Sequence, residues 1–168
     1  PSYSGRYLDS VFDIVLNFLF LMAICYVSAT SIWFTLLAFI SIQLQGTLYN
    51  YYYVILRNKS VGGDSTSKIF EYKTPRALPG ESQKSVNILF SIYQIVYGTF
   101  DKIIHALDAD AYKVKTFPNW FMTVLSLYGL GFQLLIIAVM LPLGWIEFIV
   151  PFFIFYTALI LGLIWIRK

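Results

Sequence analysis

The sequence predicts an all-α integral membrane protein. Of its 168 residues, 58% are hydrophobic and only 12% are charged, whereas a soluble domain carries about 25% charged residues. Four apolar stretches are also long enough to cross a bilayer, for which a helix needs roughly 20 residues. We therefore expect one membrane domain over residues 1–168, with four transmembrane helices, one further amphipathic helix and no nucleic-acid partner.

The four apolar stretches lie at about residues 9–27, 32–56, 120–141 and 146–166. Short breaks at residues 28–31 and 142–144 separate the first stretch from the second and the third from the fourth. Connections this short join helices that lie side by side and run in opposite directions. Each of the two pairs is therefore expected to form antiparallel neighbours.

Charge is distributed unevenly along the chain. All 12 lysines and arginines lie before the first stretch, between the second and the third, or after the fourth. Four spans place these three segments on one side of the membrane, and the positive-inside rule assigns that side to the cytoplasm. The sequence thus predicts an integral protein of the cytoplasmic (inner) membrane with its basic face inside.

The segment from about residue 58 to 119 is the least hydrophobic part of the chain. Glycine and proline are frequent in residues 59–84, which is typical of a loop. From about residue 83 to 107, apolar residues recur at intervals of three and four: Leu89, Ile92, Val96, Phe100, Ile103 and Leu107. This period predicts an amphipathic helix in the cytoplasmic interface or on the membrane core.

Two acidic residues mark the start of the first apolar stretch. Asp9 and Asp13 are four residues apart, so both lie on one face of a helix, and Gly5 precedes them by one turn. Stacked carboxylates repel each other and are costly at a membrane boundary, unless a hard divalent cation binds between them. The alternative interpretation is that both are ordinary acids in a frayed cytoplasmic turn.

Gly5, Asp9 and Asp13 form the pattern G-x3-D-x3-D. This pattern resembles the second half of the signature of the CDP-alcohol phosphotransferases (CDP-alcohol phosphatidyltransferases), D-x-x-D-G-x-x-A-R-x8-G-x3-D-x3-D. The first half would precede Pro1, and four of the family's usual six bundle helices would then remain, which is the number predicted. We therefore expect a C-terminal fragment that is inactive without the missing half of the motif.

The resemblance implies a membrane transferase of phospholipid biosynthesis. Such an enzyme moves a substituted phosphate from a CDP-linked lipid, such as CDP-diacylglycerol, to a small alcohol and releases CMP. It implies two Mg²⁺ or Mn²⁺ ions, with Asp9 and Asp13 as metal ligands and Asp13 also as the catalytic base, on the cytoplasmic side. It further implies a homodimer. The connection after the second span is longer than is usual in the family, so the acceptor alcohol is not assigned.

Two further residues are candidates for substrate or cofactor binding, together with Gly5. Asn50 and Arg57 lie with Gly46 near one face of the second span, and Gln43 is close by. These residues are expected to line a polar cavity that faces the acidic pair, with Arg57 near a phosphate. The alternative is a cluster of interfacial tyrosines with a snorkelling arginine. Two other functions stay open: a polytopic transporter that uses Asp13 and Asn17, or a non-catalytic scaffold that docks through the amphipathic helix.

Overall fold

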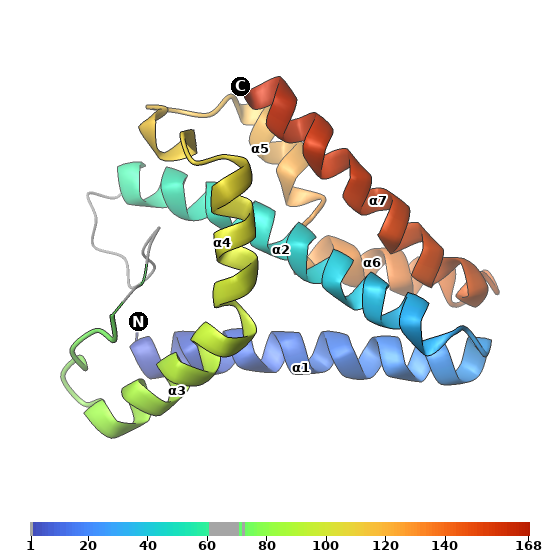
Figure 1. Cartoon of the computed structure of the whole chain (residues 1–168), viewed down its shortest axis with the longest axis horizontal. Helices are drawn as coiled ribbons and strands as arrows, with labels where there is room; N and C mark the ends of the chain where they lie inside the picture. The colour runs from blue at the N-terminus through green and yellow to red at the C-terminus, as the bar shows by residue number, and fades with distance from the viewer. Residues whose placement is uncertain (1, 61–70, 72) are drawn as a thin grey trace. The chain divides into compact units, whose positions relative to one another are not determined.

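The computed structural model describes residues 2–60, 71 and 73–168, and these form helices without any strand. The order is α1 (Tyr3–Ser28), α2 (Ile32–Ser60), α3 (Gln83–Val96), α4 (Gly98–Leu107), the short 3₁₀ helix η1 (Ala111–Lys113), α5 (Asn119–Ser126), α6 (Leu130–Met140) and α7 (Ile146–Arg167) (Figure 1). The all-α prediction is confirmed for this part of the chain.

Three of these helices, α1, α2 and α7, are long and apolar enough to cross a membrane. The pair α5 and α6 also qualifies if it is counted as one span, although the two helices are bent by 49° at the break between them. The described residues therefore contain three potential spans, or four with the bent pair. The predicted number of four depends on how this pair sits in the bilayer.

The break between α5 and α6 falls inside the stretch expected to form one helix over 120–141. Buried Tyr128 lies in the break and stacks on Tyr156 of α7, with ring centroids 4.6 Å apart. A Cβ atom at the next residue, Gly129, would lie 3.4 Å from the ring of Tyr49. The helix is thus interrupted beside an aromatic stack, and a Cβ atom at Gly129 would press mainly on the Ser126 carbonyl oxygen, at 3.1 Å.

The amphipathic segment also forms two helices, whereas the sequence predicted one over 83–107. Tyr97 separates α3 from α4, and α4 begins with buried Gly98. Glycine has a low helix propensity, which favours an interruption at this position. The apolar residues of α3 also differ in burial: Val86 and Phe90 are buried, whereas Ile92 is exposed.

The chain forms two compact units. The first unit comprises residues 1–15 and 51–117, and the second comprises residues 16–50 and 118–168. In the first unit, Tyr7 of α1 is fully buried against Val86 and Phe90 of α3. Tyr3 and Tyr93 pack against this cluster. These contacts fasten α3 to the start of α1.

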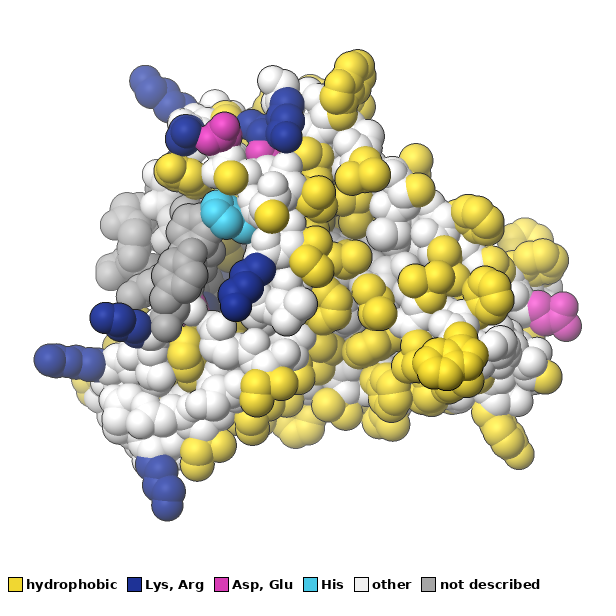
Figure 2. Space-filling view, viewed as in Figure 1, with side chains coloured by type: hydrophobic (Ala, Val, Ile, Leu, Met, Phe, Trp, Pro, Cys, Tyr) yellow, Lys and Arg dark blue, Asp and Glu magenta, His cyan; other side chains and the backbone are white. Residues whose placement is uncertain are grey.

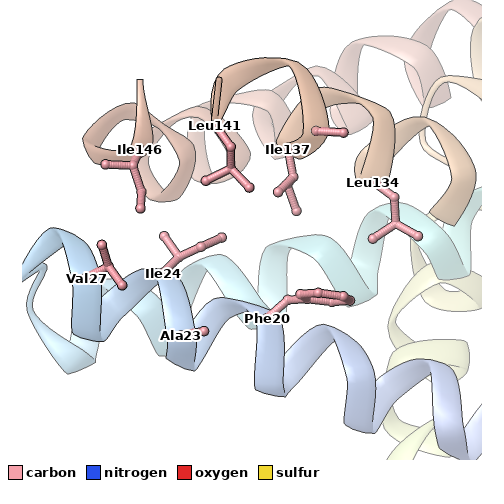
Figure 3. Close-up of a pocket in the computed structure, with 9 residues that line it drawn as sticks. Phe20, Ala23, Ile24, Val27, Leu134, Ile137, Leu141 and Ile146 are labelled. Carbon is pink, nitrogen blue, oxygen red and sulfur yellow. The ribbon is translucent and has the colours of Figure 1, made fainter. Parts of the chain in front are cut away.

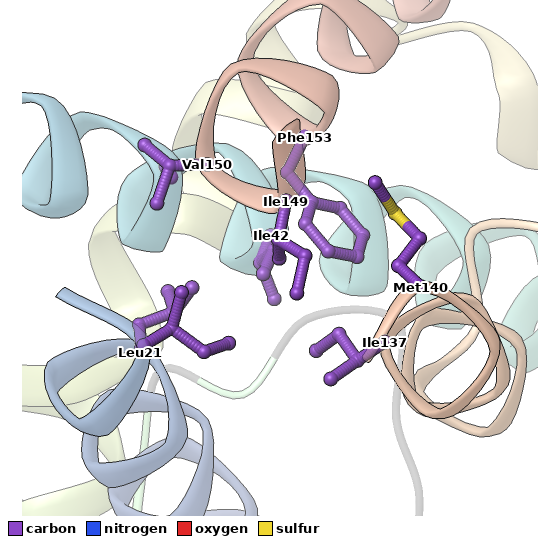
Figure 4. Close-up of a cluster of buried hydrophobic side chains, with 9 residues drawn as sticks. Leu21, Ile42, Ile137, Met140, Ile149, Val150 and Phe153 are labelled. Carbon is purple, nitrogen blue, oxygen red and sulfur yellow. The ribbon is translucent and has the colours of Figure 1, made fainter. Parts of the chain in front are cut away.

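The second unit has a larger apolar core, supplied by α1, α2, α6 and α7. It consists of nine buried residues: Leu21, Ile24, Ala38, Ile42, Ile137, Met140, Ile149, Val150 and Phe153. Figure 4 shows this cluster of side chains between the helices. Many other hydrophobic side chains of this unit lie on its surface (Figure 2). Trp165, for example, is 79% exposed. An apolar surface of this extent is typical of helices that contact lipid.

Candidate functional site

Asp9 and Asp13 lie one turn apart on α1, within the first unit. The Asp9 side chain is exposed and the Asp13 side chain is half-buried. No residue that the structure describes forms a hydrogen bond or an ion pair with either carboxylate. The pair therefore carries negative charge that no described protein group neutralises, which is the property that a bound cation requires.

Tyr97, at the junction of α3 and α4, belongs to the same electrostatic environment. Burial raises the pKa of the Tyr97 phenol, and the negative charges of Asp13, Asp101 and Asp9 raise it further, in that order of strength. The Tyr97 ring stacks on Tyr93, with centroids 5.4 Å apart. The α3–α4 junction thus brings the Tyr97 hydroxyl into the electrostatic range of the acidic pair and of a third acid, Asp101.

Asp101 lies in the first turn of α4 and is one of the acids that raise the pKa of Tyr97. Burial is the main cause that raises its pKa to about 6, while a hydrogen bond donated by the Tyr93 hydroxyl, 3.3 Å away, acts in the opposite direction. The nearby charges of Glu71 and Arg6 raise and lower the pKa of Asp101, respectively. Asp101 therefore changes its charge near pH 6.

A mostly buried ion pair lies at the beginning of α1. The Arg6 guanidinium contacts the Glu71 carboxylate, with side-chain exposures of 20% and 8%. The same guanidinium lies over the ring of Tyr7, 4.5 Å from its centroid, and the Tyr7 hydroxyl donates a hydrogen bond of 3.0 Å to Glu71. The pair fixes the Glu71 carboxylate beside Arg6, which precedes Asp9 by three residues on α1.

The first turn of α1 is capped by a side chain from a distant part of the chain. The backbone N–H groups of Tyr3 and Ser4 donate hydrogen bonds of 3.1 and 2.7 Å to the Glu81 carboxylate, and the Ser4 hydroxyl also donates to it. These bonds, led by that of the Ser4 hydroxyl, lower the pKa of Glu81 to about 2. Glu81 satisfies donors that a helix leaves unpaired at its N-terminus.

The predicted binding residues have different surroundings. Gly5 is exposed, and a Cβ atom there would lie 2.6 Å from the hydroxyl oxygen of Ser2, whose side chain can rotate away. Asn50 and Arg57 are exposed on α2 and belong to different units. Their place in a cavity that faces the acidic pair stays a prediction.

The tyrosines at 49 and 51–53 of α2, which were considered as interfacial anchors, differ in burial. Tyr51 and Tyr52 are buried in the first unit. The Tyr52 hydroxyl donates to the buried Asp108 carboxylate, and the Tyr51 hydroxyl donates a hydrogen bond of 3.0 Å to the Asp108 carbonyl oxygen. These two tyrosines tie the end of α4 to α2, whereas Tyr53 is exposed.

An apolar pocket of about 470 Å³ lies between α1 and α6 in the second unit. Figure 3 shows side chains from the two helices facing each other across it. Hydrocarbon groups line the pocket, from Phe20, Ala23, Ile24 and Val27 of α1 and from Leu134, Ile137, Ala138, Leu141 and Ile146. Its volume is within the range of small-molecule sites, roughly 300 to 1,000 Å³, and its lining suits an apolar ligand.

Several of these features were missed by the sequence analysis. Tyr93, Tyr97 and Asp101 recur at intervals of four, so their shared helical face was visible in the sequence, but nothing in the sequence related that face to Asp13. The contacts of Glu71 and Glu81 with α1 had no local signal, because each spans more than 60 residues.

Comparison of the chain with protein-family models, with curated proteins and with solved structures finds no match. The functional interpretation therefore rests on the residues themselves.

Proposed function

We propose that this chain is part of a membrane transferase of the CDP-alcohol phosphotransferase type. It transfers a substituted phosphate group from a CDP-linked lipid to an alcohol in phospholipid biosynthesis, and CMP is released. The observation that carries the proposal is the acidic pair: Asp9 and Asp13 stack at the start of an apolar helix, and no described residue neutralises either carboxylate.

The chemistry of the pair suits a hard divalent cation. Asp9 and Asp13 would hold Mg²⁺ or Mn²⁺ through carboxylate oxygens, which are the ligands such ions prefer. When bound, the metal supplies positive charge that stabilises the phosphoryl oxygens of the reacting group. Within the described residues, no three His, Cys, Asp or Glu side chains are grouped closely enough to bind a metal ion. The resemblance implies further ligands in addition to these two acids.

Asp13 has a second role in the proposal. Its carboxylate accepts the proton of the alcohol hydroxyl that attacks the donor phosphate, as a base within hydrogen-bond reach can do. The half-buried position of Asp13, next to exposed Asp9, supports this division of roles, because a base acts best where bulk water is partly excluded.

The surroundings of α1 support a lipid donor. The helix that begins with the acidic pair also lines the apolar pocket through Phe20, Ala23 and Val27. A pocket with this lining suits a hydrocarbon chain. All lysines and arginines except Arg167 and Lys168 belong to the first unit, which supports an active site on the cytoplasmic side.

The test is CMP release by the full-length protein with CDP-diacylglycerol, Mg²⁺ and a panel of small alcohols. Asp13→Asn is expected to lower kcat by about 10³-fold, because general-base catalysis contributes on this order. Asp110→Asn is the matched control, since Asp110 is exposed and its ion pair with exposed Lys113 is of the surface kind that contributes little.

Chelation of divalent cations is expected to abolish turnover, and added Mg²⁺ to restore it. Full activity of folded Asp13→Asn would reject the assigned base. A folded full-length protein that releases no CMP with any alcohol would reject the transferase and leave the transporter and scaffold hypotheses.

A further inference from the structure

Two buried polar side chains of α2 lack hydrogen-bond partners. Gln43 is 3% exposed and Thr47 is 2% exposed. Within the part of the chain that the structure describes, neither Nε2 of Gln43 nor Oγ1 of Thr47 has a hydrogen-bond partner. Buried groups of this kind are rare in native proteins, and in a membrane span there is no bulk water to satisfy them.

Neighbouring glutamines of the same unit show the usual arrangement. The Nε2 atom of Gln133 donates to the Ile42 carbonyl oxygen and to Oε1 of Gln45, both at 3.1 Å. Gln45 in turn donates to the Phe153 carbonyl oxygen at 3.0 Å and to Thr157 at 2.8 Å. The second unit thus satisfies the buried amides that join its helices, and Gln43 and Thr47 stand outside this network.

Helix geometry places the two unsatisfied groups on one face. Gln43 and Thr47 are one turn apart, whereas Gln45 lies about 200° around the helix from Gln43. Gly46 is within about 60° of Gln43, and a Cβ atom there would meet nothing within 4 Å. This face of α2 therefore has two unsatisfied polar groups and open space beside them.

The antiparallel neighbour α1 adds a third polar group to the same unit. Asn17 is buried, and it lies one turn after Asp13. Ring packing between Phe18 and Phe39, with centroids 5.4 Å apart, pairs this part of α1 with α2. This pairing puts Asn17 at a similar height to Gln43, on the stripe of α1 that carries the acidic pair.

We infer that Gln43 and Thr47, beside the open space at Gly46, form a polar subsite for uncharged oxygen groups of a substrate. The Gln43 amide donates to an acceptor oxygen, and the Thr47 hydroxyl both donates and accepts. Neither side chain is charged, so the subsite suits hydroxyl or ester oxygens and not a phosphate. This inference rests on the proposed function, in which such oxygens belong to the glycerol esters of the donor lipid or to the hydroxyls of the acceptor alcohol.

The first test compares stability in the full-length protein. Gln43→Leu and Thr47→Val remove unsatisfied polar groups, so the Tm is expected to stay the same or to rise by about 2 to 4 °C. Gln45→Leu, the matched control, leaves its partners unpaired and is expected to lower the Tm. Equal losses of Tm in Gln43→Leu and Gln45→Leu would overturn the inference. Such a result would mean that the Gln43 amide already has a hydrogen-bond partner in the folded protein, for example an ordered water.

The second test measures steady-state CMP release by the Thr47→Val and Gln43→Leu variants. Loss of one hydrogen bond to substrate is expected to raise one KM by about tenfold while kcat changes by less than about threefold. A higher KM for CDP-diacylglycerol identifies ester oxygens as the ligand, and a higher KM for the alcohol identifies hydroxyls. Unchanged values of both KM in both variants would overturn the subsite.

A binding measurement keeps the subsite testable if the transferase is rejected. Dioleoylglycerol in nanodiscs and free glycerol in solution supply uncharged ester and hydroxyl oxygens without phosphate. At least one of these probes is expected to raise the Tm of the native full-length protein more than that of the Gln43→Leu/Thr47→Val double variant. Equal shifts for both proteins with both probes would reject the subsite, whatever reaction the protein catalyses.

Discussion

The interiors of the two units differ in the groups that they contain. The first unit encloses charged groups, with the Arg6–Glu71 pair and Asp108 inside it. In the second unit, no described Asp, Glu, Lys or Arg residue is buried, and nine buried apolar residues form the core. The stability of the first unit should therefore depend on charge and pH, and that of the second on close packing.

Within each unit, groups of similar chemistry have different surroundings. In the first unit, Glu71 and Asp108 accept hydrogen bonds, whereas no described residue bonds to Asp9 or Asp13. In the second unit, Gln45 is fully bonded whereas Gln43 is not. Polar side chains that lack a hydrogen-bond partner, while similar side chains of the same unit have one, are the best markers of binding sites in this chain.

The largest stability effect is expected from the buried ion pair. Glu71→Gln leaves the Arg6 guanidinium without its carboxylate, and breaking one side of such a pair costs about 3 kcal/mol. The free energy of unfolding of the full-length protein in detergent measures this loss. Glu147→Gln, at an exposed acid of the second unit, is expected to change it by less than about 0.5 kcal/mol. Equal losses in the two variants would contradict the difference between the units.

A smaller effect, which depends on pH, is expected at Asp101. Its pKa is about 6 in the folded protein, against 3.8 for an ordinary aspartate. Between these values the folded state binds the proton more tightly, so folding stability falls as pH rises from about 4 to about 6 and then levels off.

Asp101→Asn removes this dependence, and it is expected to raise the free energy of unfolding at pH 7 by about 2 kcal/mol relative to the native protein. Tyr93→Phe removes the hydrogen bond that lowers the pKa of Asp101, so the fall in stability should extend to higher pH. Unfolding measured from pH 4 to pH 8 tests both variants. If the free energy of unfolding depends on pH in the same way for the native protein and for Asp101→Asn, then Asp101 titrates alike in the folded and unfolded states.

The helices themselves were largely predictable from the sequence, because apolar length and period are local properties. The expected stretches at 9–27, 32–56 and 146–166 all lie inside helices that the structure describes. The helix breaks at Tyr97 and Gly129 were not predicted. The break at Gly129 coincides with contacts to Tyr49 and Tyr156, which come from distant parts of the sequence.

The candidate site was predictable only in part, for the same reason. The spacing of Asp9 and Asp13 along the chain is enough to single them out, because stacked acids at the start of an apolar helix are unusual. Tyr97 and Asp101 are ordinary polar residues of an amphipathic helix until α3 packs on α1. The sequence placed Gln43 close to the predicted polar cavity, but a single sequence does not show which buried amides lack partners.

The smallest effect is expected in the second unit, at Gly129 in the break before α6 and at Gly131 inside α6. A Cβ atom at Gly129 would lie 3.1 Å from the Ser126 carbonyl oxygen and 3.4 Å from the Tyr49 ring, whereas at Gly131 it would meet nothing within 4 Å. Gly129→Ala is therefore expected to lower the free energy of unfolding by about 1 kcal/mol, since a tightly packed backbone must shift. Gly131→Ala lies inside α6 and is expected to raise it by about 0.5 kcal/mol, because alanine favours the helix. Unfolding of both variants in detergent measures the difference, and the same sign for both would show that the bend between α5 and α6 does not depend on the close approach at Gly129.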